Sequence, residues 1–66
     1  MIRYAIGITY PNGKKDWSEY RTKEENFARA KQLKEWSDKN NKGWQITVFK
    51  YERLYGSNRT LETFDI

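Results

Sequence analysis

Most of the side chains that carry enzyme chemistry are missing from this chain. It contains no cysteine and no histidine, so no Ser/His/Asp or Cys/His arrangement and no thiolate or imidazole zinc site can form. Its four glycines are isolated from one another and do not make a phosphate-binding loop. We therefore expect no catalytic residue, no cofactor and no metal ion, and we predict that the protein is not an enzyme.

The carboxylates are the remaining candidates for chemistry. Four of them lie on segments that we predict to be strands: Asp16, Glu19, Glu52 and Glu62. A metal site or an acid–base pair needs two or more carboxylates held together. Nothing in the alternation of these strands brings two of them together, and most acidic side chains on strands are solvated. We interpret all four as surface charges.

Aromatic and basic side chains are the distinctive ones. Aromatic residues make up 17% of the chain, and 13 basic residues outnumber 9 acidic residues for a formal net charge of +4. Trp, Tyr and Arg dominate the hot spots of protein interfaces, and they also stack on bases and neutralise phosphates. A basic excess of this size permits nucleic-acid binding without indicating it.

The elements that position these side chains begin with a strand. Apolar side chains occupy every second position at the N-terminus: Ile2, Tyr4, Ile6, Ile8 and Tyr10. This alternation predicts a strand with one buried face. Pro11 and Gly13 then favour a hairpin turn with a glycine bulge, followed by a second strand from Lys14 to Arg21.

The type of turn decides which face of the sheet carries Trp17. The bulged turn places Trp17 opposite Gly7 on the outer face of the sheet. The same register places Tyr20 opposite Tyr4 on the inner face. A two-residue Asn-Gly turn would shift the register by one and move Trp17 into the core beside Ile8. The proline favours the bulged form, and both registers stay open.

A helix and two further strands complete the pattern. Residues Thr22 to Glu25 form a capping box that starts a helix, and the segment Asn40 to Gly43 ends it. The apolar arc of the helix contains Phe27, Ala30, Leu33 and Trp36. A third strand runs from Trp44 to about Tyr55, and Arg59 to Ile66 form the last strand, whose weaker pattern suits a sheet edge.

These elements predict one α+β domain over residues 1–66, with the order ββαββ. A right-handed crossover and central placement of the two most apolar strands give an antiparallel sheet in the order 2-1-3-4, with the helix on one face. That face carries Ile2, Tyr4, Ile6, Ile8, Trp44, Ile46 and Val48. A chain this short buries only about 60% of the surface that its unfolded form exposes, so help from a second chain is expected.

The other sheet face has no predicted covering layer. We predict that it is a binding surface, and its residues are Arg3, Lys15, Trp17, Arg21, Phe49, Tyr51 and Arg53. The alternative is that these rings only pack over one another and reinforce a thin sheet. An aromatic and guanidinium cluster on an uncovered face favours binding.

Two resemblances bear on function. The hairpin Tyr10 to Lys14 followed by the helix start Thr22 to Glu25 resembles the arm-type DNA-binding domains of phage and transposon integrases. That resemblance implies that Arg3, Lys15, Trp17 and Arg21 read the major groove, although the family has a third strand before its helix. The whole chain also resembles the small Lys- and Asn-rich orphan proteins of phages and mobile elements. That resemblance implies a compact inhibitor of host defence.

We therefore expect a small non-catalytic protein-binding module, a phage-type inhibitor or adaptor that docks on a host protein through its open sheet face or an edge strand and can form a homo-oligomer. The alternative is a nucleic-acid-binding domain that uses the same face. The N-terminus lacks the apolar run of a signal peptide, and no stretch approaches the ~20 apolar residues of a membrane span. We expect a cytoplasmic protein with no membrane partner.

Overall fold

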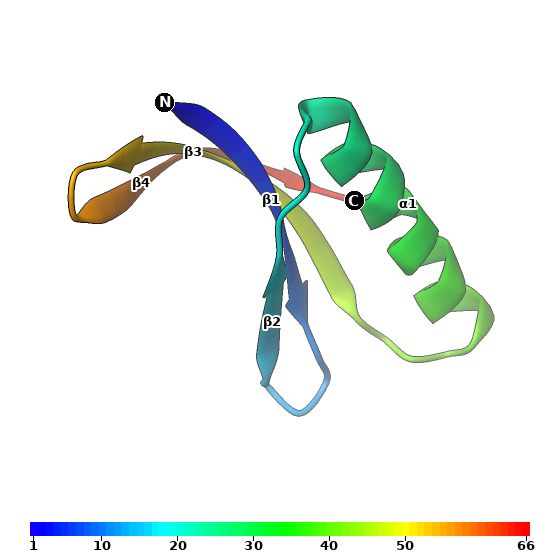
Figure 1. Ribbon diagram of the computed structural model, residues 1–66. Coiled ribbons are helices and arrows are strands. Elements are labelled where there is room, and N and C mark those ends of the chain that lie inside the picture. Colours follow the sequence, from blue (N-terminus) through cyan, green and yellow to red (C-terminus); the bar gives the residue numbers. More distant parts are fainter.

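The four strands and the helix follow one another in the predicted order. The computed structural model describes all residues from Met1 to Ile66. The strands are β1 (Ile2–Thr9), β2 (Lys15–Ser18), β3 (Gln45–Leu54) and β4 (Ser57–Asp65), and the helix is α1 (Lys23–Lys39). The sheet is antiparallel in the order β2-β1-β3-β4, and α1 packs against β1 and β3 on one face (Figure 1). The predicted α+β fold and strand order are confirmed.

The first hairpin has the bulged turn. The amide of Tyr10 donates to the carbonyl of Lys14 at 2.8 Å, and the amide of Gly13 donates to the carbonyl of Tyr10 at 2.9 Å. Gly13 has φ +89, a left-handed conformation that suits glycine. Gly7 is the register partner of Trp17, so Trp17 lies on the face away from the helix. The two-residue alternative, with Trp17 in the core, is excluded.

The second strand is shorter than predicted. It ends at Ser18 instead of reaching Arg21, and Tyr20 does not pair with Tyr4. The reason is Asn26 on α1, whose side chain accepts from the Tyr20 amide at 3.1 Å and donates to the Tyr20 carbonyl at 3.2 Å. Because this amide satisfies both backbone groups of Tyr20, the chain can leave the sheet early and turn into the helix.

The helix begins at the predicted cap but buries a different set of residues. The hydroxyl of Thr22 accepts from the amide of Glu25 at 3.0 Å, as expected of a capping box. Asn26, Ala30 and Ser37 are the buried residues of α1. Trp36 is 47% exposed, so its placement in the buried arc was wrong.

Two small polar residues, Asn26 and Ser37, join the expected apolar ones at the helix–sheet contact. Ser37 is fully buried, and its hydroxyl accepts from the backbone amide of Trp44 at 3.0 Å. This bond holds the segment between α1 and β3 against the helix. The rotation that brings Asn26 and Ser37 inward turns Trp36 outward, where its ring stacks on Trp44 with centroids 5.1 Å apart. Trp44 itself precedes β3 and is half-buried.

The core lies between the helix and the middle of the sheet. Its buried members are Ile6, Ile8, Ala30, Ile46 and Val48. Partly buried side chains surround them: Tyr4, Tyr10, Phe27, Leu33, Trp44, Phe64 and Ile66. Ile2 was expected in this core but is 47% exposed. The helix lies over the other end of β1 and does not reach the N-terminus (Figure 1).

The β3–β4 hairpin extends beyond the rest of the molecule. Its turn lies on the side of the structure away from α1 (Figure 1), and the structure measures 39 × 25 × 15 Å. A bulge interrupts this ladder, because Lys50 pairs with Glu62 whereas Tyr51 pairs with Thr60. Leu61 is therefore the extra residue of β4. The single helix is too short and too polar to cross a bilayer.

Candidate functional site

The outer face of the sheet is organised around two small residues of β1. Ala5 is the register partner of Phe49, and Gly7 is the partner of Trp17 on its other side. Because alanine and glycine leave space above the sheet, the rings of the neighbouring strands can lean inward over them. Ala5 is completely buried although it faces away from the helix. The outer face is therefore partly covered, by its own aromatic side chains.

Three rings from two strands make this cover, and we call Trp17, Phe49 and Tyr51 the aromatic cluster. The Trp17 and Phe49 centroids are 5.2 Å apart with the planes inclined by 32°. Tyr51 meets Trp17 edge to face at 6.1 Å. Tyr51 is only 4% exposed and Phe49 is half-buried, whereas Trp17 is 55% exposed. The cluster is thus a packed base that presents one indole to solvent.

A charged pair anchors the buried end of the cluster. The hydroxyl of Tyr51 donates to Oε1 of Glu19, and Nε of Arg3 lies 2.8 Å from Oε2 of the same carboxylate. Burial raises the pKa of Tyr51 above its ordinary value of 10.0, and the hydrogen bond to Glu19 adds to the rise. The Glu19 side chain is 25% exposed. This carboxylate therefore belongs to the site, although the sequence indicated a solvated charge.

Register explains how the Glu19 contacts arise. Arg3 and Tyr51 are direct partners on β1 and β3, so their side chains meet on the outer face. Glu19 directly follows β2 and reaches across β1 to both of them. Only the placement of Tyr51 opposite Arg3 could have suggested this contact beforehand, because Glu19 and Tyr51 are 32 residues apart in the chain.

The structure brings four of the seven predicted surface residues together: Arg3, Trp17, Phe49 and Tyr51. Lys15 lines a shallow hollow of about 210 Å³ beside Trp17 and Phe49. Arg21 lies in the segment after β2 and lines a separate hollow of about 500 Å³ with Arg3 and Glu19. These two cations flank the aromatic cluster without belonging to it.

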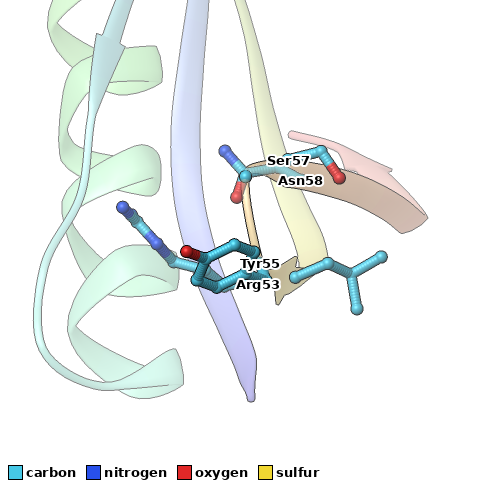
Figure 2. Close-up of a pocket in the computed structure, with 6 residues that line it drawn as sticks. Arg53, Tyr55, Ser57 and Asn58 are labelled. Atoms are coloured by element: carbon cyan, nitrogen blue, oxygen red, sulfur yellow. The ribbon is translucent and has the colours of Figure 1, made fainter.

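Arg53 lies two residues beyond Tyr51 on β3, where its charge acts on the Tyr51 hydroxyl, and it also borders the tip of the second hairpin. It lines a broad hollow of about 690 Å³ at the β3–β4 turn, together with Tyr55, Ser57 and Asn58 (Figure 2). Tyr55 is fully exposed. The hollow belongs to one hairpin and no other element lines it, so we treat the tip as a separate feature.

The helix side carries a second exposed indole, Trp36, which the sequence placed on the apolar arc of the helix. Trp36 lines a hollow of about 410 Å³ with Arg29, Gln32, Leu33 and Trp44. The Lys42 ammonium lies 5.7 Å from the centroid of the Trp36 ring. This indole has a similar exposure to Trp17 but lies on the other side of the molecule, which makes it a natural control.

Comparison of the chain with protein-family models, with curated proteins and with solved structures finds no match. The structure holds no group of three or more Asp and Glu side chains placed to bind a metal ion. The aromatic cluster and its charged anchor are therefore the best-defined surface feature on which to base a function.

Proposed function

We propose that this chain is a small non-catalytic protein-binding module that docks on a host protein through its outer sheet face. The proposal rests on one observation, the half-exposed indole of Trp17 held on a packed aromatic base. A partner can bury this ring at little cost in conformational entropy, because Phe49 and Tyr51 already hold it in place. A phage-type inhibitor or adaptor acting in the cytoplasm would work by such docking alone.

The charge distribution favours a protein partner over a nucleic acid. The Arg3 guanidinium, at the centre of the face, is already bound to Glu19. Phosphate binding needs several free cations along a groove. The three free cations around the cluster, Lys15, Arg21 and Arg53, lie on three separate hollows. A surface with an apolar centre and charged residues around it matches the usual anatomy of a protein interface.

Affinity capture from host lysate tests this proposal, with the purified chain as bait at low and at high salt. We expect a host protein to remain bound at high salt, because burial of Trp17 is not screened by ions. Trp17→Ala should lose that protein. Trp36→Ala should retain it, because that exposed indole lies on the helix side.

Direct titration with mixed DNA and RNA at two salt concentrations examines the alternative. Tight binding at low salt that weakens steeply with ionic strength, together with nuclease-sensitive capture, would show a nucleic-acid-binding domain. Equal loss of the captured protein in Trp17→Ala and Trp36→Ala would also argue against docking through the outer face.

A further inference from the structure

β4 has a long open edge. It spans nine residues, Ser57–Asp65, and pairs only with β3. No helix or loop lies against its other edge (Figure 1). The opposite edge of the sheet, β2, has only four residues. An exposed edge of this length is a template for another strand, because half of its backbone donors and acceptors have no partner in the sheet.

The bulge at Leu61 determines which residues of β4 point outward. The Ile66 amide donates to the Ile46 carbonyl of β3 at 3.0 Å, so alternation directs Phe64 and Glu62 toward β3 as well. Thr63 then directs its backbone groups to the open edge. The extra residue reverses the alternation. On the far side of the bulge, Asn58 and Thr60 therefore direct their backbone groups to the open edge.

This reversal allows β4 to pair antiparallel with β4 of a second copy, and the charged side chains favour one register. In that register Asn58 of one copy lies opposite Thr63 of the other, and both direct their backbone groups to the shared edge. Thr60 lies opposite Leu61 of the second copy and Leu61 opposite Thr60, so the two bulges meet at the two-fold axis and the ladder continues on both sides. If the register is shifted by one residue, residues whose backbone groups face β3 lie opposite residues whose backbone groups face the open edge along most of the strand.

The same register pairs opposite charges. Arg59 lies opposite Glu62 of the second copy, and two-fold symmetry repeats this pair. Both residues lie on the helix-side face, since their partners on β3 are Glu52 and Lys50. Within one chain Arg59 contacts Glu52 at 3.2 Å, whereas Glu62 forms no ion pair. Leu61, which is 41% exposed, lies beside the two-fold axis.

We propose that β4 pairs with β4 of a second copy of this chain in this register, joining two four-stranded sheets into one continuous sheet. The pairing leaves the outer face uncovered, and the two-fold axis places the aromatic clusters of both copies on the same side of the sheet. The dimer does not depend on whether that face binds a host protein.

Sedimentation equilibrium of the purified chain tests the pairing. We expect a species of twice the 8.0 kDa chain mass that dissociates on dilution. Thr63→Pro removes an outward amide and should raise the dissociation constant at least tenfold, while leaving the fold intact. Lys15→Pro is the matched control, because it removes an outward amide of the opposite edge and should leave the dissociation constant unchanged.

A charge exchange tests the register. Arg59→Glu and Glu62→Arg each place like charges opposite one another twice, so each variant alone should dimerise roughly tenfold to a hundredfold more weakly. An equal mixture should recover the dimer as a heterodimer, because both cross-strand pairs then have opposite charges. Native mass spectrometry separates the heterodimer from the homodimers by mass.

Four results would overturn the proposal. The first is a wild-type chain that stays monomeric up to about 1 mM. At that concentration even a homodimer with a dissociation constant of about 1 mM would be half formed. The second is equal weakening by Thr63→Pro and Lys15→Pro. The third is a mixture of the charge variants that associates no better than either variant alone. A dimer lost in Trp17→Ala but kept in Thr63→Pro would place the interface on the outer face instead.

Discussion

Gly7 and Trp17 are register partners across β1 and β2, and the glycine leaves the space into which the aromatic cluster packs. A methyl group added to Gly7 would collide with the ring of Phe49. A side chain added at Gly7 on the central strand should therefore displace Phe49 and, with it, the exposed indole of Trp17.

The first prediction concerns this space. Gly7→Ala should lower the free energy of unfolding by about 1 to 3 kcal/mol, because the overpacked ring must move away from the strand. The displaced Phe49 should also disturb Trp17, which is seen as a changed near-ultraviolet circular dichroism band. A variant as stable as the wild type with an unchanged spectrum would contradict the packing of Phe49 over Gly7.

The second prediction separates the two faces of the sheet. Trp17→Ala should cost about 1 to 2 kcal/mol, because the ring is half-exposed and loses mainly its contacts with two other rings. Trp44→Ala should cost about 3 kcal/mol, because the ring packs between Tyr10 and Trp36 at the edge of the core. Urea unfolding measures both values. Equal and severe destabilisation would show that Trp17 belongs to a core.

The third prediction follows from the hydroxyl of Tyr51. Its pKa is raised in the folded state by burial and by the hydrogen bond to Glu19, so above about pH 10 the unfolded chain loses this proton first. The contribution of Tyr51 to stability is therefore complete below pH 10 and is lost as the pH rises through the folded-state pKa. Tyr51→Phe should be less stable than the wild type at neutral pH.

Thermal melts between pH 8 and pH 11.5 measure this dependence. The melting temperature of Tyr51→Phe should fall less steeply with pH than that of the wild type. Tyr55→Phe is the matched control, because it removes the hydroxyl of a fully exposed side chain and should leave the alkaline slope unchanged. Identical alkaline slopes for Tyr51→Phe and the wild type would show that the Tyr51 hydroxyl is not buried against a carboxylate.

The fourth prediction concerns Asn26, whose side chain bonds the segment that follows β2. Asn26→Ala leaves the amide and carbonyl of Tyr20 without their partners and should cost about 2 to 3 kcal/mol. Asn40→Ala removes an exposed side-chain bond at the other end of the helix and should cost under about 1 kcal/mol. Chemical unfolding compares the two. A small, equal effect would mean that water replaces the Asn26 bonds.

Local patterns were sufficient to predict much of the fold. The alternation of residues 2–10 predicted β1, the residues Pro11 and Gly13 predicted the bulged hairpin, and Thr22 with Glu25 predicted the helix start. Each of these signals acts between neighbours in the chain, where steric and hydrogen-bonding preferences are strong. With the strand order they also placed Trp17 and Phe49 on one face.

The remaining features depend on contacts between distant segments, and only the tertiary structure decided them. The carboxylate of Glu19 joins the site because Arg3 on β1 and Tyr51 on β3 are register partners and both contact it. Asn26 is buried because the segment that follows β2, which contains Tyr20, packs against the helix, and its polar side chain gives no sign of this in the sequence. The bulge at Leu61 arises from pairing with β3. Sequence thus determined the elements and their order, whereas packing decided which polar groups were buried, because burial depends on what lies above each residue.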